Sequence, residues 1–283
     1  MRDLAVVTTS SGMSDIVAGW KSEGRSVAFV PTMGALHKGH GALIEKASEL
    51  ADRVVVSIFV NPLQFGTGED FDSYPRHDEA DQAFLRELPV DVLFMPTVDE
   101  VYPPGVVITA AAGPVGDTFE GASRPGHFDG VLRVVKRLCA IISPDFALFG
   151  RKDAQQLFLV DTMVRNEGLP IRIVPVDTVR APDGLALSSR NAYLSDDERA
   201  RALAIPLALA EAERATTLSG ALSVVRERLE SEPGLTFDYV AAVDPETFHQ
   251  LDEDSPLREA TLIVAVSLST TRLIDNRSLH FPQ

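Results

Sequence analysis

The stretch that decides the fold is VAFVPTMGALHKGH, residues 27–40. It starts as a β-branched and aromatic run of strand length at 27–30, passes through Gly34 and Gly39, and enters a helical pattern at 40–51. Glycines allow a tight turn there and a close approach of the backbone to a ligand. The helix that follows directs free N–H groups and its positive dipole end at the turn, so this position favours a phosphate.

The same alternation continues along the chain. Apolar runs at 54–60, 90–95, 146–149 and 171–176 are separated by amphipathic patterns at 78–88, 131–142 and 154–167. This order predicts an α/β fold, a doubly wound parallel sheet with helices on both faces. Ligands of such sheets bind beyond the carboxyl ends of the strands, where the chain order reverses.

The pattern changes near residue 177. A polar segment at 177–191 contains the turn signal Pro182-Asp183-Gly184, and helical patterns follow at 196–214 and 218–229. Strand-like runs at 237–243, 261–267 and 271–274 predict a short antiparallel sheet. We therefore expect two domains, 1–178 and a smaller α+β domain at 179–283, with the Gly- and Pro-rich segment 102–126 as an ordered insertion in the first.

Composition limits the kinds of partner. The 283 residues carry a formal charge of −15, which argues against a nucleic-acid partner because binding of a phosphate backbone needs a basic surface. No apolar run reaches the roughly 18 to 20 residues of a membrane span, and the N-terminal sequence is too polar for a secretory signal. The single cysteine, Cys139, fits a reducing compartment. We expect a cytoplasmic protein with no membrane partner.

His37 and His40 lie three residues apart at the first turn, where both imidazoles can donate to phosphate oxygens and stabilise charge that grows in a transition state. A capping or packing role is the alternative for either ring. A metal site is less favoured, because no third ligand of suitable type lies nearby in the sequence.

Polar residues follow two further strands. Asn61 and Gln64 come after the run at 54–60, and their neutral amides suit a small polyol or carboxylate, although an Asx turn before Pro62 accounts equally well for Asn61. Lys152 follows the run at 146–149 and supplies a mobile positive charge for phosphate, while Asp153 is a good N-cap for the next helix and Gln156 lies in its first turn.

The fourth polar stretch, GLALSSRN at 184–191, lies at the expected domain junction. Ser188, Ser189 and Arg190 form a compact set of phosphate donors that a mobile linker could close onto a nucleotide. A plain serine-rich loop is the alternative.

Seven segments together resemble the pantoate–β-alanine ligase family, in order and at workable spacing through nearly the whole chain. They are PTMGALHKGH (31–40), SIFVNPLQF (57–65), YPR (74–76), SRPGHFDGV (123–131), FGRKDAQQL (149–157), DGLALSSRN (183–191) and TRLIDN (271–276). This family belongs to the nucleotidylyltransferase superfamily. Arg133 and Ala181 depart from its usual pattern, and neither lies at a position assigned to substrate.

The resemblance implies a Rossmann-like nucleotide-binding domain and a two-step reaction. Pantoate attacks ATP to give pantoyl adenylate and pyrophosphate, and β-alanine then displaces AMP to give pantothenate. ATP is a substrate, its Mg²⁺ is held mainly by the phosphates with no dedicated protein metal site, and no prosthetic group is needed. Pantoate, β-alanine and ATP are the implied small-molecule partners of a homodimer.

The resemblance also implies the site residues. His40, His37 and Lys152 would be catalytic; Gln64, Gln156 and Asn61 would bind pantoate, with Tyr74 as a neighbour; and Gln64 would also bind β-alanine. The ATP-binding set would be Met33, Gly34, Ala35, Leu36, His37, Lys38, Gly39, His40, Gly150, Arg151, Lys152, Asp153, Val179, Leu187, Ser188, Ser189 and Arg190.

Two other functions share some of these features. A nucleotidylyltransferase that joins ATP to a phosphorylated partner would have the same histidine turn, but would need more cations for its second phosphate than Asn61, Gln64 and Gln156 provide. A non-catalytic nucleotide-binding or RNA-binding module is disfavoured by the net charge and by retention of the histidine pair and Lys152.

Overall fold

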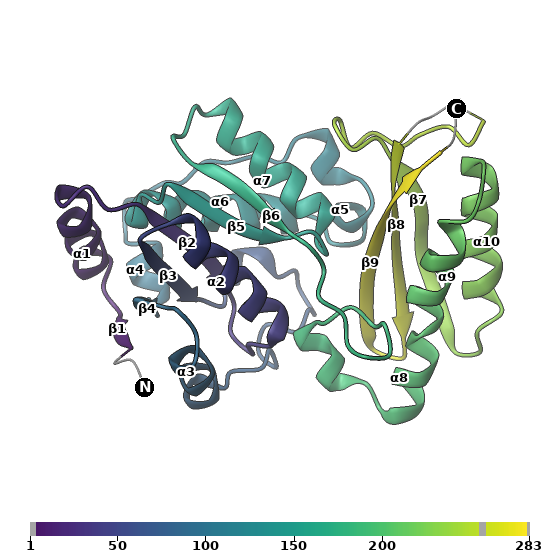
Figure 1. Ribbon diagram of the computed structural model, residues 1–283, viewed down its shortest axis with the longest axis horizontal. Helices are drawn as coiled ribbons and strands as arrows, with labels where there is room; N and C mark the ends of the chain where they lie inside the picture. The colour runs from purple at the N-terminus through teal and green to yellow at the C-terminus, as the bar shows by residue number, and fades with distance from the viewer. Residues whose placement is uncertain (1–3, 255–258, 282–283) are drawn as a thin grey trace. The chain divides into compact units, whose positions relative to one another are not determined.

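The computed structural model describes residues 4–254 and 259–281. The chain divides into two compact units. The first comprises Met1–Arg151 and Gln156–Asp177, and the second comprises Lys152–Gln155 and Thr178–Gln283 (Figure 1). Each unit has its own sheet, and each is described separately.

The sheet of the first unit has the strand order β1-β4-β3-β2-β5-β6, and every pairing in it is parallel. Its central strands are buried along nearly their whole length, which explains why they appear in the sequence as continuous apolar runs. The predicted parallel sheet is therefore confirmed. Its strands are β1 (Ala5–Val7), β2 (Val27–Thr32), β3 (Arg53–Ile58), β4 (Val92–Phe94), β5 (Phe146–Gly150) and β6 (Arg172–Val176).

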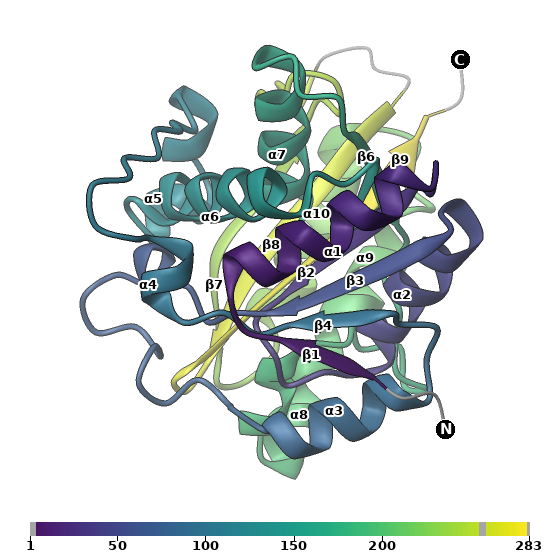
Figure 2. The same cartoon turned by 90° about the vertical axis from the view of Figure 1, so that its left-hand side faces the viewer.

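Helices cover both faces of this sheet, as the doubly wound prediction requires (Figure 2). Because side chains alternate along a strand, Phe29 of β2 packs on one face while Ala28 and Val30 pack on the other. The first face is covered by α1 (Ser10–Ser22), α6 (His127–Ile142) and α7 (Ala154–Asn166), and the second by α2 (Lys38–Leu50) and α3 (Asp78–Arg86).

The chain order reverses at β2. From β2 the chain runs outward through β3 and β4, and it later returns to the other side of β2 as β5 and β6. The carboxyl ends of β2 and β5, at Thr32 and Gly150, therefore flank the switch point at which ligands of such sheets bind. The segments PTMGALHKGH and GRKDAQQ both begin there.

Short helices make up the connections of the first unit: η1 (Pro62–Gln64), α4 (Val98–Val101), η2 (Pro114–Asp117) and α5 (Glu120–Ser123). The segment 102–126 carries only the last two of these, and the apolar run at 106–112 within it forms no strand. Val107 is 83% exposed, whereas Ala110 and Ala112 at the end of that run pack against the core.

The second unit contains the predicted antiparallel sheet, in the order β7-β8-β9. Its strands are β7 (Leu235–Val243), β8 (Glu259–Leu268) and β9 (Thr271–His280), and β9 extends beyond the predicted 271–274. Helices α9 (Ala204–Ala212) and α10 (Leu218–Glu230) pack against this sheet around Leu209, Leu222 and Val264 (Figure 1).

The single helix predicted at 196–214 is wrong. The structure has two helices there, α8 (Asp196–Ala202) and α9, separated at Leu203. Pro206 has no N–H with which to donate to the carbonyl of Ala202, so a continuous helix would lose that hydrogen bond and clash with the proline ring. The remaining short helix of this unit is η3 (Ser189–Tyr193).

Candidate active site

The turn after β2 is fixed by a buried carboxylate. Gly34 and Ala35 have φ angles of 86° and 49°, a left-handed path that favours glycine at the first position. Asp81 of α3 accepts hydrogen bonds from the N–H groups of Ala35 at 2.8 Å and Leu36 at 2.7 Å. Because these two N–H groups already donate to Asp81, the turn leaves its side chains and its helix start, rather than these two donors, for a ligand.

The two histidines of this turn are held in one tautomer. Nδ1 of His37 accepts from the N–H of Gly39 at 3.1 Å, and Nδ1 of His40 accepts from the N–H of His37 at 3.2 Å. The capping role is therefore present, since these bonds form the capping box of α2. A ring whose Nδ1 accepts carries its proton on Nε2, so each imidazole is a donor at Nε2.

His40 is also uncharged at neutral pH. Burial, together with the nearby His37, lowers the pKa of His40 to about 3. The two ring centroids lie 4.1 Å apart, so a proton on one ring disfavours a proton on the other. The pair thus consists of closely spaced donors in which His40 donates as a neutral imidazole.

Gln64 is buried and directed toward the histidine turn. Its Nε2 lies 2.9 Å from Sδ of Met33, and its Oε1 accepts from Nδ2 of Asn61 at 3.1 Å. Tyr74, the expected neighbour, is buried and its ring lies edge-on to Phe65, the residue after Gln64. Gln64 therefore lies beside the turn that follows β2.

Asn61 makes its hydrogen bonds within the protein. Its Nδ2 donates to Gln64 and to the carbonyl of Gly130, while its Oδ1 accepts from the N–H of Leu63 and from the hydroxyl of Tyr102. It is 1% exposed, so these four partners account for its amide. The Asx turn before Pro62 is real, and the same side chain orients Gln64.

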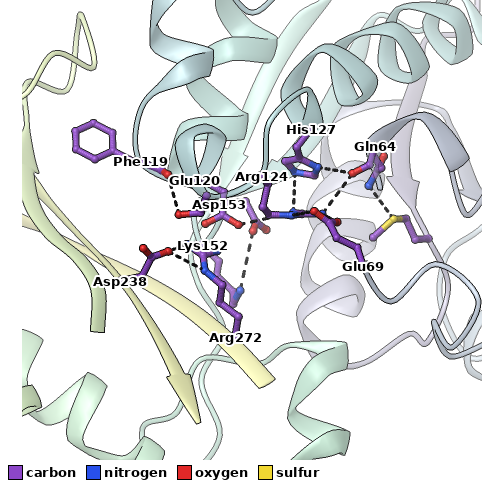
Figure 3. Close-up of polar contacts among 12 residues, drawn as sticks. Gln64, Glu69, Phe119, Glu120, Arg124, His127, Lys152, Asp153, Asp238 and Arg272 are labelled. Atoms are coloured by element: carbon purple, nitrogen blue, oxygen red, sulfur yellow. Dashed lines mark hydrogen bonds and ion pairs between the residues drawn. The ribbon is translucent and has the colours of Figure 1, made fainter. Parts of the chain in front are cut away.

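A cluster that the sequence reading did not assign supports Gln64 from the other side. Nδ1 of His127 donates to the carbonyl of Gln64 at 2.8 Å, and its Nε2 accepts from Arg124 at 3.0 Å; Arg124 is in turn paired with Glu69 (Figure 3). Burial and the adjacent guanidinium lower the pKa of His127 to about 4, which keeps the ring neutral. The only sequence signal was the place of Arg124 and His127 within SRPGHFDGV, and Glu69 lies in none of the motifs.

Gly130 allows α6 to approach the turn that carries Gln64. A Cβ at this position would lie 2.1 Å from the carbonyl oxygen of Leu63 and 2.7 Å from Cα of Gln64. Only glycine fits without a shift of the backbone. Asn61, Gln64, Gly130 and His127 therefore form one packed assembly.

The second unit contains the other predicted phosphate-binding residues. The Nζ atom of Lys152 lies 4.0 Å from Oδ1 of Asp153, and the Lys152 side chain is 18% exposed. Val179 and Leu187 are joined by a backbone hydrogen bond in a hairpin whose turn is at 182–184. Ser188 follows directly, and its hydroxyl caps η3 by accepting from the N–H of Arg190 at 3.3 Å.

The remaining predicted residues lie in the first unit. Lys38 is exposed at the start of α2, and Gln156 is half-buried in the first turn of α7. Gly150 ends β5, and Arg151 pairs with Asp177. Within residues 4–254 and 259–281, no group of three or more His, Cys, Asp or Glu side chains is arranged to hold a metal ion. None of the helices in the same described residues combines the length and the hydrophobicity that a membrane span needs.

A doubly wound parallel sheet with a glycine-containing turn and a helix start beyond its switch point is typical of nucleotide-binding α/β proteins. Comparison with known proteins identifies the family within this class. The family model for pantoate-beta-alanine ligase matches residues 5–278, and the chain belongs to this family. Its reaction is the ATP-dependent condensation of pantoate with β-alanine, and the protein is accordingly a ligase of pantothenate biosynthesis.

Individual relatives agree over most of the chain. It is 51% identical to the pantothenate synthetase of Acidothermus cellulolyticus over 88% of this chain and 84% of that protein. The crystal structure of pantothenate synthetase from Thermus thermophilus has a TM-score of 0.92 at 44% identity, covering 99% of this chain and 100% of that one. The Francisella tularensis pantoate-beta-alanine ligase, solved with β-γ ATP and β-alanine, has a TM-score of 0.81 at 32% identity over 97% of both chains. These matches confirm the family and the fold that the sequence motifs predicted.

Proposed function

We propose that this ligase works through a pantoyl adenylate. A pantoate carboxylate oxygen attacks the α-phosphorus of ATP and pyrophosphate leaves; the amine of β-alanine then attacks the activated carbonyl, loses a proton, and AMP leaves. No protein nucleophile is required. Cys139 does not offer one, because burial raises the pKa of its thiol to about 12.

Nε2 of His37 and of His40 donates to the phosphates in this scheme. The observation that carries the proposal is their shared tautomer at the start of α2, with Nδ1 fixed by the backbone. Donors fixed in advance stabilise charge that develops during phosphoryl transfer without reorganising. Lys152 and Arg190 add positive charge, and Ser188 and Ser189 add hydroxyl donors. The residues expected above to line the nucleotide complete this set.

Gln64 binds pantoate through its amide, together with Gln156, and later contacts β-alanine. Asn61 acts on pantoate through Gln64, because its own amide is used inside the protein. Neutral amides suit hydroxyl and carboxylate groups, since they give directional hydrogen bonds at a small desolvation cost. His127 and Arg124 keep the Gln64 turn in place.

Mg²⁺ would be held mainly by the phosphate oxygens of ATP, where it would reduce the negative charge that the attacking carboxylate meets. Residues 179–283 serve as a lid domain in this proposal, with a boundary at 178.

The functional form is a cytoplasmic homodimer. The exposed Val6 on the edge strand β1 is compatible with an interface, and sedimentation at several protein concentrations tests it.

Isotope exchange tests the adenylate directly. Labelled pyrophosphate should enter ATP when pantoate is present and β-alanine is absent, and AMP should accumulate only when both acids are supplied. His37→Ala should abolish most of this exchange, whereas loss of its cap at the start of α2 should lower the unfolding free energy by only about 1 kcal/mol. Exchange that requires β-alanine would refute the adenylate, because both substrates would then react in one step.

A further inference from the structure

Two adjacent residues of β9, Asp275 and Asn276, lie in the TRLIDN segment to which the mechanism above gives no role. Successive side chains of a strand point to opposite faces of the sheet. Asp275 lies on the face that carries Leu273 and Leu279, which pack with α9 and α10, and Asn276 lies on the opposite face. One short piece of strand therefore reaches two different segments of the second unit.

Asp275 holds the hairpin that leads into Ser188–Arg190. Its carboxylate is buried and pairs with both terminal nitrogens of Arg180, at 2.6 and 3.0 Å. The same guanidinium donates to the carbonyl of Gly184 at 3.2 Å, so it spans the hairpin from its first strand to its turn. A bidentate pair of this kind fixes direction as well as distance.

Asn276 holds the other segment. Its Nδ2 donates to the backbone carbonyl of Lys152 at 2.8 Å, and its own N–H donates to Oδ1 of Asp275 at 2.8 Å. This hydrogen bond agrees with the division of the chain into two units. Lys152–Gln155 belongs to the second unit, although the residues on either side of it belong to the first. A lysine ammonium is carried on four flexible carbons, so anchoring its backbone restricts where the charge can lie.

We propose that Asp275 and Asn276 are positioning residues for ATP activation: together they hold the Lys152 turn and the hairpin before Ser188–Arg190 in a fixed arrangement. This inference rests on the proposed function, which assigns both segments to the phosphates. Neither side chain needs to touch ATP. Their contribution is geometric, because a displacement of about 1 Å at a reacting centre can reduce a rate by roughly a hundredfold.

The kinetic test is a double-mutant cycle with full-length protein and pantoate-dependent pyrophosphate exchange. Asn276→Ala should lower kcat/KM for ATP about tenfold and leave the KM for pantoate nearly unchanged. In a Lys152→Ala background the same substitution should have almost no further effect, because the charge that it positions is gone. Ser278→Ala, exposed on the same strand and face, is the matched control and should match the parent protein.

Amide hydrogen exchange measures the two anchored segments, the Lys152 turn and the hairpin before Ser188–Arg190, separately. Asn276→Ala should speed exchange in 150–156 but not in 178–191, and Arg180→Lys should do the reverse, because it keeps the charge and loses the bidentate geometry. If the Asp275→Asn protein folds, its exchange pattern should be the same as that of Arg180→Lys. Unchanged exchange in 150–156, or a full tenfold loss from Asn276→Ala in the Lys152→Ala background, would overturn the proposal. A Lys152→Ala protein with parent activity would instead refute the role of Lys152 in the proposed function, while the exchange pattern would still decide the anchoring.

Discussion

Gly130→Ala is the substitution whose effect the structure fixes most closely. The added methyl would lie 2.1 Å from the carbonyl oxygen of Leu63, so either α6 or η1 must move by about 1 Å before the contact is tolerable. Overpacking of this kind costs roughly 1 to 3 kcal/mol of unfolding free energy. Replacing a mid-helix glycine by alanine returns about 1 kcal/mol, so the net loss of stability should be small.

The loss of activity should be larger than the loss of stability. Because η1 ends at Gln64, a movement of about 1 Å in η1 directly displaces the amide that we propose to bind pantoate. We expect kcat/KM for pantoate to fall about a hundredfold and the KM for ATP to change little.

Gly19→Ala is the control. Gly19 lies in α1, where a Cβ would meet nothing within 4 Å, so the same substitution should raise the unfolding free energy by about 0.5 to 1 kcal/mol and leave both kinetic constants unchanged. Steady-state AMP release at varied pantoate and urea denaturation of both variants are the measurements. If Gly130→Ala keeps the parent kcat/KM for pantoate, close packing of α6 on η1 does not position Gln64.

Four further outcomes follow from the same contacts. His40→Ala should slow pyrophosphate exchange by roughly two to three orders of magnitude, because loss of one transition-state donor usually raises the activation free energy by about 2.7 to 4 kcal/mol. ATP turnover at the parent rate would contradict this role. Gln64→Ala should raise the KM for pantoate and leave ATP affinity near the parent value, and a collapse of ATP binding in calorimetry would place Gln64 on the other ligand. Arg190→Ala should slow adenylate formation more than its capture by β-alanine, measured as separate single turnovers; equal losses would contradict a phosphate clamp. The folded pKa values of His40 and His127 lie below the unfolded value of about 6.5. The stability that the two neutral rings contribute is therefore present above pH 6.5 and is lost as the pH falls toward 3 to 4, and each ring should lower the unfolding free energy by up to about 2 kcal/mol at pH 5. In urea denaturation at a series of pH values, His127→Asn should lessen the dependence of the unfolding free energy on pH.

The sheet could be predicted from the sequence because the central strands are buried on both faces. The predicted run at 54–60 overlaps β3, and the run at 146–149 overlaps β5. The edge strand β1 has only three residues, two of them exposed, so it leaves no comparable apolar signal. The break at Leu203 was missed because helical periodicity continues through the two helices, whereas the missing N–H of Pro206 is a local backbone effect.

Residues at the strand ends could be proposed from the sequence because each motif is continuous along the chain. The residues that hold those motifs could not. Asp81 reaches Ala35 across 46 positions, and His127 reaches the carbonyl of Gln64 across 63. Their partners are backbone atoms, and no residue type at the receiving position reveals such a contact. Recognition of SRPGHFDGV marked His127 as part of a motif without saying what it does.

The tautomers of the two histidines explain how one turn can serve both folding and the chemistry that we propose. Nδ1 of each ring satisfies an N–H group at the start of α2, which would otherwise lack an intrahelical partner. That bond fixes the ring and leaves the proton on Nε2. A lysine at position 40 could carry more charge but could not accept the N–H of His37, so it could not be held by the helix start in this way. Burial lowers the pKa of His40, so its Nε2–H remains a neutral donor throughout the physiological pH range. In the proposed mechanism, Lys152 and Arg190 supply the positive charge instead.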